Sequence, residues 1–303
     1  MSQYGAAEYL GHQLLLTHQE QRGLVPKTVF YKLWCISDRY LMDNYGLDIV
    51  LPRYWYMYGE MVDEQSVDTG FRTAPGGPWG GQAYKPVWDL EPTEFDVTEQ
   101  EREFIDNTVK WTANRFERKE TQYLESYQYQ SYAPNNFIRS YSELRAHLQY
   151  VNLETQEVLT PLAVRPEFDA DGNKELIEAY LDELVITYPE HESEFADLQA
   201  LFLRWEDTVR LLLDQPEPYE EIAGLLDEFI EALSKAVLQL KYNDDIPETR
   251  LEEWRKVADN ARERFESNLA ETRKSLLLRE DPHGELDGVS EAYDELVLSN
   301  AIS

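Results

Sequence analysis

The histidines and the single cysteine are the residues from which metal or nucleophilic chemistry would first be sought. None of the five histidines has an HxxxH or HExxH spacing, which would place two imidazoles on one helix face for a metal. The histidines are His12, His18, His147, His191 and His283. Cys35 stands between Trp34 and Ile36 in a helical pattern, a setting typical of a buried and inert thiol. As the only cysteine, it excludes an intrachain disulfide and a cysteine-rich metal site.

The acidic segments offer no better catalytic constellation. Asp169-Ala-Asp-Gly-Asn173 resembles the head of a calcium loop, but its glycine comes fourth and the twelfth position is Tyr180, not glutamate. A turn that caps the next helix is therefore favoured. The chain contains no GxSxG, P-loop or GxGxxG motif, and pairs of carboxylates arise by chance in so acidic a sequence. We expect neither an enzyme nor a cofactor or metal, with a carboxylate–metal hydrolase or nuclease as the least favoured alternative.

The charge of the chain is its strongest global signal. It carries 59 acidic and 28 basic residues in 303, a formal net charge of −31, and only ten of the basic residues are lysine. Strongly hydrated carboxylates keep a protein soluble where salt screens their repulsion over a few ångströms. The composition therefore predicts a halophilic, archaeal host. The same charge argues against nucleic-acid binding through phosphates, which requires clustered lysine and arginine.

The N-terminal residues MSQYGAAEYLGHQLLLTHQEQ carry neither a basic region nor a long apolar core, and so do not resemble a signal peptide. No apolar run reaches the roughly 18 residues that a membrane span requires. We therefore expect a cytoplasmic protein that does not bind a membrane.

Four aromatic residues in five positions, within Arg53–Met61 (RYWYMYGEM), form the sharpest local feature. A base-stacking surface would interleave aromatics with lysine and arginine, but here Arg53 is alone and acidic residues follow. In a strand, Tyr54, Tyr56 and Tyr58 would share one side, opposite Trp55 and Met57. The pattern favours a core element with one edge presented to a protein partner.

The elements around this segment are predicted to be helical. Residues 4–20 place Leu10, Leu14, Leu15 and His18 near one face, and a second helix runs from Pro26 to a C-cap glycine, Gly46. Residues 48–58 form short strands or begin another helix. Residues 64–92 are predicted to form a long Gly/Pro loop, with regular structure excluded between Ala74 and Gly81. A later helix begins with a Thr98–Glu101 capping box.

The pattern of apolar and polar residues changes after about residue 165. Four amphipathic helical patterns cover 173–187, 193–214, 218–241 and 247–280, separated by proline- and asparagine-containing linkers. The fold class is therefore predicted as mainly α. A helical N-terminal domain (1–165) with short strands precedes an antiparallel helical bundle (166–280) and a polar tail (281–303).

The first domain resembles the Panacea (SocA-like) antitoxin domain family over about residues 20–150. The similarity rests on Phe30–Gly46 (FYKLWCISDRYLMDNYG), on Tyr54–Gly59, and on the later segment Val97–Asp106 (VTEQEREFID). Glu60 stands where the family usually has proline, and the family's later His-Glu has only a loose counterpart at residues 141–144. The resemblance implies a non-enzymatic, mainly helical domain that binds a protein toxin or acts as a proteolytic adaptor.

We therefore expect a protein-interaction module, antitoxin-like or regulatory, whose partner is a toxin or a protease component. The expected partner-binding residues lie on the aromatic stretch and on the Gly/Pro loop: Arg53, Tyr54, Tyr56, Tyr58, Phe71, Trp79 and Trp88. The alternative is a structural or assembly protein, viral or cellular, that forms a homo-oligomer through its C-terminal helices.

Overall fold

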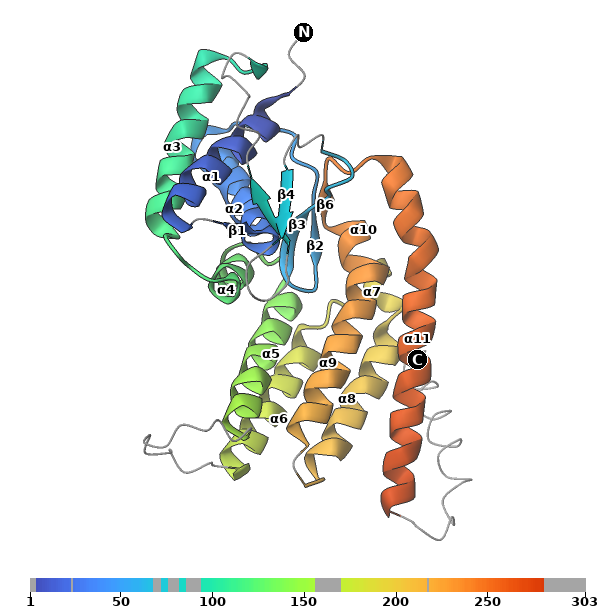
Figure 1. Cartoon of the computed structure of the whole chain (residues 1–303). Helices are drawn as coiled ribbons and strands as arrows, with labels where there is room; N and C mark the ends of the chain where they lie inside the picture. Colours follow the sequence, from blue (N-terminus) through green and yellow to red (C-terminus); the bar gives the residue numbers. More distant parts are fainter. Residues whose placement is uncertain are drawn as a thin grey trace, which may run out of the picture. The chain divides into compact units, whose positions relative to one another are not determined.

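The computed structural model of the chain describes residues 4–22, 24–67, 72–75, 82–85, 94–155, 170–216 and 218–280. The fold is mainly α with a few short strands, which confirms the predicted class (Figure 1). The chain divides into two compact units, Met1–Tyr132 with Leu238–Glu253 and Ala133–Val237 with Trp254–Ser303. The helix that begins at Asn136 thus belongs to the second unit, and the boundary predicted near residue 165 lies outside the described residues.

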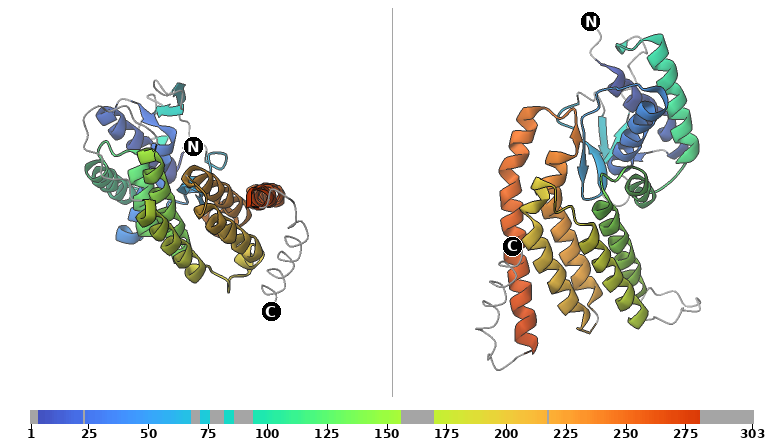
Figure 2. Two further views of the ribbon diagram at one scale, coloured as in Figure 1. Left: turned by 90° about the horizontal axis from the view of Figure 1, so that it is seen from below. Right: turned by 180° about the vertical axis from the view of Figure 1, so that it is seen from behind.

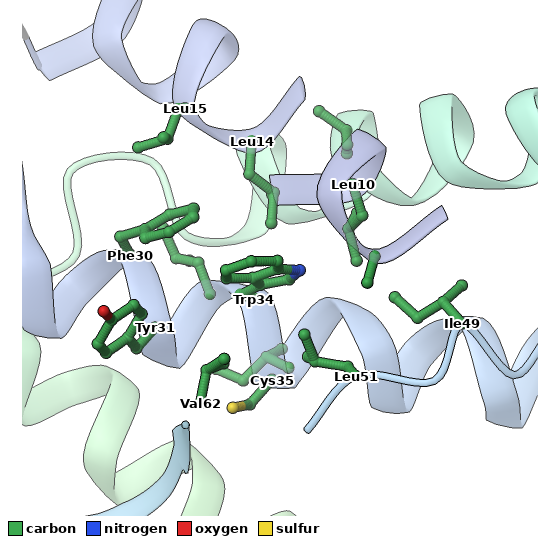
Figure 3. Close-up of a cluster of buried hydrophobic side chains, with 14 of the residues drawn as sticks. Leu10, Leu14, Leu15, Phe30, Tyr31, Trp34, Cys35, Ile49, Leu51 and Val62 are labelled. Carbon is green, nitrogen blue, oxygen red and sulfur yellow. The ribbon is translucent and has the colours of Figure 1, made fainter. Parts of the chain in front are cut away.

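Two helices build the core of the first unit, and both were predicted from sequence. Helix α1 spans Ala6–Arg22 and α2 spans Lys27–Tyr45. Gly46 ends α2 with a φ of 63°, a left-handed conformation that favours glycine, and its N–H bonds back to the carbonyls of the last turn. The buried side chains that face each other between α1, α2 and the following segment are Leu10, Leu14, Leu15, Phe30, Trp34, Ile49 and Leu51 (Figure 3).

Two small antiparallel sheets accompany these helices. Strands β1 (Val25–Pro26), β5 (Gln82–Lys85) and β4 (Arg72–Pro75) pair in the order β1-β5-β4. Strands β3 (Gly59–Val62), β2 (Arg53–Tyr56) and β6 (Asn243–Asp244) pair in the order β3-β2-β6. The aromatic stretch is therefore a strand, and β2 and β3 form a tight hairpin in which Tyr56 lies opposite Gly59.

The predicted loop at residues 64–92 contains more regular structure than its composition indicates. Residues 72–75 and 82–85 are the paired strands β4 and β5, whereas residues 76–81, which hold the four glycines, lie outside the described residues. Strand β5 also pairs with β1, in the connection between α1 and α2. This pairing with a distant segment supplies the hydrogen bonds that local sequence could not reveal.

Helices α3 (Glu99–Arg115) and α4 (Thr121–Tyr132) complete the first unit together with α10 (Gln239–Lys241) and the start of α11 (Glu248–Glu280). The predicted capping box is present at the start of α3. The Thr98 hydroxyl accepts from the Glu101 N–H at 3.2 Å, and the Glu101 carboxylate accepts from the Thr98 N–H at 2.7 Å. These bonds satisfy two of the N–H groups that a helix start otherwise leaves unpaired.

The second unit is a bundle of long helices, as Figures 1 and 2 show from three sides. Within it α5 packs against α6 and α9, and α8 packs against α6 and α9. Its elements are α5 (Asn136–Thr155), α6 (Ala170–Thr187), α7 (Ser193–Ala196), α8 (Gln199–Leu213), α9 (Tyr219–Leu233), the π-helical turn Ser234–Leu238 and most of α11. Its core is strongly aromatic, with Trp205 stacked on Phe229 at a centroid distance of 5.0 Å.

One predicted helix is broken in two. The pattern at 193–214 predicts a continuous helix, but α7 ends at Ala196 and α8 begins at Gln199. The Tyr188 hydroxyl donates to the Phe195 carbonyl at 2.7 Å, and that carbonyl also accepts from the Leu198 N–H at 3.0 Å. These two bonds replace the regular i to i+4 bond, so the chain tightens between the helices.

None of the described helices of the protein has the length and apolarity to cross a membrane.

Candidate functional site

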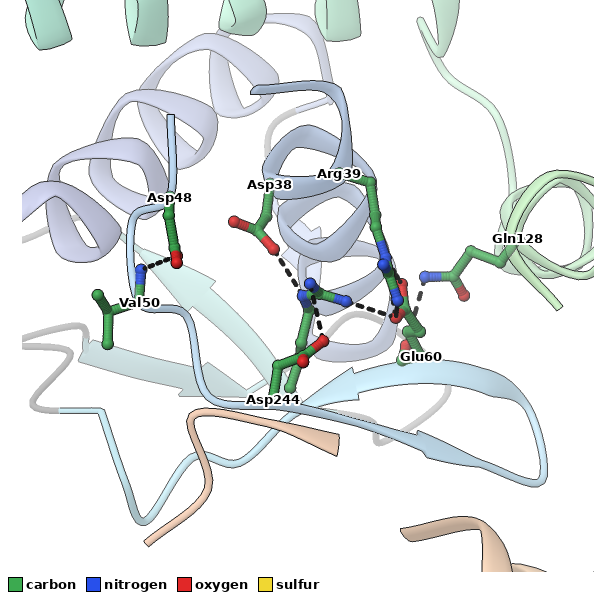
Figure 4. Close-up of polar contacts among 8 residues, drawn as sticks. Asp38, Arg39, Asp48, Val50, Glu60, Gln128 and Asp244 are labelled. Atoms are coloured by element: carbon green, nitrogen blue, oxygen red, sulfur yellow. Dashed lines mark hydrogen bonds and ion pairs between the residues drawn. The ribbon is translucent and has the colours of Figure 1, made fainter. Parts of the chain in front are cut away.

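The guanidinium of Arg53 on β2 is buried and pairs with carboxylates from α2, β3 and β6. Figure 4 shows these carboxylates, Asp38, Glu60 and Asp244. The Arg53 Nε donates to Asp38 on α2 at 2.6 Å, and the two terminal nitrogens pair with Glu60 on β3 and Asp244 on β6, each at 2.9 Å. Arg39 also reaches Glu60, at 2.5 Å. All three nitrogens of the Arg53 guanidinium therefore have carboxylate partners, from three different elements. We call Asp38, Arg39, Arg53, Glu60 and Asp244 the Arg53 network.

The turn of the β2–β3 hairpin is fixed by side chains from two helices. Lys32, fully buried on α2, donates to the carbonyl of Tyr58 and to the amide oxygen of Gln128 on α4. Tyr129, the next residue on α4, donates its hydroxyl to the Met57 carbonyl at 2.7 Å. Two carbonyls of a tight turn thus receive bonds from the core. An isolated hairpin of this length is marginal in water, so these bonds hold its conformation.

The glycine of this turn is required by its surroundings. Gly59 has a φ of 93°, and a Cβ at this position would lie 2.6 Å from the amide oxygen of Gln128. The positive φ therefore disfavours any larger residue, and a Cβ would also force the Gln128 amide to move. This is the glycine of the RYWYMYGEM stretch, and it allows the close approach of α4 to the hairpin.

The segment Leu238–Glu253 closes the other edge of the sheet. The Trp55 N–H donates to the Tyr242 carbonyl at 2.8 Å, and Arg250 bonds Asp63 at 3.2 Å across a separation of 187 positions. The Asp63 N–H in turn donates to the Pro52 carbonyl at 2.9 Å. The hairpin is thus held by residues that lie far apart in the sequence.

Burial dominates the electrostatics of the Arg53 network. It raises the pKa of Asp38 to about 6, although Arg53 opposes this rise and the Glu60 charge adds to it. Burial by itself lowers the pKa of Arg53, but the charges of Glu60, Asp38 and Asp244 outweigh it and raise that pKa. Burial, and then the Glu60 charge, also raise the pKa of the Cys35 thiol, which keeps it protonated and unreactive.

The geometry of the Arg53 network suits positioning and not proton transfer to a substrate. Asp38, Arg53 and Glu60 are at most 6% exposed, so a substrate could not reach their charged atoms. Their donors and acceptors are also already engaged with one another. Among the described residues, no group of three or more histidine, cysteine, aspartate or glutamate side chains is arranged to hold a metal ion.

The predicted partner-binding residues fall into two groups. Arg53 is buried in the network, whereas Tyr54 and Tyr56 are half-buried on the opposite face of β2 and Tyr58, in the turn, is 36% exposed. Trp55 and Met57 are buried, so the chain alternates along β2 as predicted. Phe71, Trp79 and Trp88 lie outside the described residues.

Sequence reasoning did not identify the partners of Arg53. Asp38 is a charged residue in a largely apolar stretch of α2, and Glu60 stands at an inward position of the strand alternation, so a signal for these two was present. Lys32, which binds the hairpin turn, lies in the same stretch of α2. Asp244 carries no such signal, because its strand has only two residues and pairs with a strand that lies far away in the sequence.

Comparison with known proteins adds no assignment to this geometry: no protein-family model, no curated protein and no solved structure matches the chain.

Proposed function

We propose that this protein is a non-enzymatic interaction module, antitoxin-like or a regulatory adaptor, and that a protein partner binds the tyrosine face of the β2–β3 hairpin. The observation that carries the proposal is the alternation along β2. Arg53 and Trp55 are anchored in the interior, while Tyr54 and Tyr56 on the other face, and Tyr58 in the turn, retain access to solvent. Phe71, Trp79 and Trp88, which the sequence also predicts as partner-binding residues, lie outside the described residues and carry no part of this argument.

The energetics of the Arg53 network support a positioning role. A buried ion pair contributes little net stability, because desolvation cancels most of the attraction between its charges. The raised pKa of Asp38 is a direct sign of this cost. A network of this kind instead favours a single arrangement of the strand that carries it.

A hairpin held in one conformation is well suited to binding a protein. Tyrosine offers a large contact area with few rotatable bonds, and a surface that is already ordered loses little entropy on association. Tyrosine is accordingly enriched among the residues that dominate binding energy. The Panacea-like segments of residues 20–150 add the proposal that the partner is a toxin or a protease component, and the charge of −31 adds a halophilic archaeal cytoplasm as its setting.

The test compares three forms of the full chain in a pull-down from a halophilic archaeal lysate at molar KCl. The double variant Tyr56→Ala/Tyr58→Ala removes two of the three tyrosines of this face, and Tyr150→Ala removes a surface tyrosine of the second unit as a control. We expect a stoichiometric partner that the wild type and the control retain and the double variant loses. Truncation of two such residues should weaken binding about tenfold or more. A partner that binds all three forms equally, or no partner at all, contradicts the proposal.

An assembly protein is the second candidate, and exposed apolar residues of the second unit favour it. Ile186 on α6 is 77% exposed and Val257 on α11 is 46% exposed. Exposed apolar side chains can mark a surface that a second copy covers. Light scattering at molar salt would support assembly if the chain alone formed a closed oligomer that Val257→Asp dissociated. A monomer at all accessible concentrations would exclude this candidate.

A further inference from the structure

The end of α3 and the turn into α4 form the most basic short segment of this acidic chain. Residues 110–119 hold Lys110, Arg115, Arg118 and Lys119, against the single carboxylate of Glu117. All four cationic side chains are exposed. None of the four forms an ion pair with any residue that the structure describes, although the chain has 59 acidic residues.

Aromatic rings hold two of these cations in place. The Arg115 guanidinium lies 5.2 Å from the centre of the Tyr127 ring and 5.9 Å from that of Trp111. The Lys119 ammonium lies 4.5 Å from the Tyr123 ring, which is 45% exposed. Cation–π contacts of this kind restrict long side chains that would otherwise be mobile. Less conformational entropy is then lost when a ligand binds.

We propose that this surface binds an acidic peptide segment of a partner protein, in which carboxylates alternate with aromatic or aliphatic side chains. The basic–aromatic surface comprises Lys110, Trp111, Arg115, Arg118, Lys119 and Tyr123. Unpaired cations offer N–H donors to carboxylates, and the adjacent rings offer apolar area to the side chains between them. Charge complementarity is specific to this place, because a strongly acidic surface elsewhere on the chain repels an acidic ligand.

The same surface is a poor match for single-stranded nucleic acid. Bases need free ring faces, but one face of Trp111 is stacked on Tyr40 at a centroid distance of 3.9 Å, and Arg115 lies against the same ring. A nucleic acid also carries a charge on every nucleotide. The net charge of −31 therefore repels it more strongly than a peptide that carries a carboxylate on every second residue.

The test uses the full chain and a fluorescein-labelled 12-residue peptide of alternating glutamate and phenylalanine, followed by fluorescence anisotropy at two KCl concentrations. The triple variant Arg115→Gln/Arg118→Gln/Lys119→Gln removes three cations of the surface. Its matched control, Lys256→Gln/Arg264→Gln/Lys274→Gln, removes three exposed cations of α11 and changes the net charge from −31 to −34 in the same way.

We expect saturable binding that the surface variant weakens about tenfold and the control leaves unchanged. Tyr123→Ala should weaken it several-fold, because the ring both orients Lys119 and contacts the peptide. Equal losses in the two triple variants, or no saturation up to about 1 mM peptide, overturn the proposal. A labelled 12-nucleotide oligothymidylate that binds more tightly than the peptide, with the same dependence on Arg115, also overturns it and assigns the surface to nucleic acid.

The proposal is independent of the function proposed for the hairpin. The peptide assay does not involve Tyr54, Tyr56 or Tyr58. Its failure therefore leaves the hairpin proposal intact, and a failed pull-down with the hairpin variants leaves this one intact.

Discussion

Replacing Arg53 by methionine should destabilise the first unit strongly, although it swaps a polar residue for an apolar one in the core. Methionine fills a similar volume but removes the guanidinium that pairs at once with Asp38, Glu60 and Asp244. Glu60 keeps Arg39 at 2.5 Å, and the Asp244 side chain is 52% exposed and can return to water. The cost therefore falls mainly on Asp38, which is left buried without its cation.

The magnitude follows from the rules for buried ion pairs. Removing one partner of such a pair costs about 3 to 5 kcal/mol, because the remaining charge stays desolvated. A typical domain is stable by only about 5 to 15 kcal/mol, so this loss is a large fraction of the total. Adding Asp38→Asn to Arg53→Met removes the stranded carboxylate and should recover about 2 kcal/mol of stability, a value typical of interactions between contacting residues.

The measurement is urea unfolding at fixed molar KCl, followed by circular dichroism and by hydrogen exchange. Exchange of the Trp55 N–H, which donates to the Tyr242 carbonyl, reports the opening of this sheet even if the two units unfold separately. The control is Arg210→Met, which removes a guanidinium that pairs at the surface with Asp182 and Glu206. Surface ion pairs contribute less than about 1 kcal/mol to the free energy of unfolding, so this variant should lose little stability.

Two results would refute this reasoning. An Arg53→Met loss no larger than that of Arg210→Met would mean that the Arg53 network contributes no more than a surface pair. If the double variant were less stable than Arg53→Met alone, the buried and unpaired carboxylate of Asp38 would not be the cause of the lost stability.

Three further predictions concern Gly59, the titration of Asp38 and the dependence of stability on salt. Gly59→Ala should lower the free energy of unfolding by about 1 to 3 kcal/mol, because φ is positive there and the added Cβ would meet Gln128. Gly224→Ala, in the interior of α9 where a Cβ meets nothing, should instead raise it by about 0.5 to 1 kcal/mol. The midpoints of urea unfolding check both values. The pKa of Asp38 is higher in the folded state than its ordinary value of 3.8, so its contribution to stability is present below pH 3.8 and is lost as the pH rises through about 6. Asp38→Asn should remove this slope of stability against pH, and a slope between pH 4 and 6 that is identical in variant and wild type would contradict the assignment. If the host is halophilic, the thermal midpoint should keep rising above about 1 M KCl, where ordinary charge screening is complete; a plateau at lower salt would exclude a halophilic origin.

Local signals predicted the helices well because their physical causes are local. The apolar spacing of α1 and α2, the left-handed glycine at the end of α2 and the capping box at the start of α3 each involve residues a few positions apart. Hydrogen bonds within one turn, and steric limits on one residue, are readable without a partner. The break between α7 and α8 was missed because it depends on a hydroxyl from Tyr188, outside the amphipathic pattern.

The candidate site could not be predicted from local sequence patterns, because it is formed by contacts between residues far apart in the sequence. The sequence by itself determined the helices, the acid excess, and an aromatic stretch whose alternation is compatible with a strand. Only the tertiary structure decided that Arg53 points inward to three carboxylates, and that a two-residue strand from position 243 completes its sheet. The physical reason is that burial makes the charge of Asp38 unfavourable, and only partners brought close by folding can offset that cost.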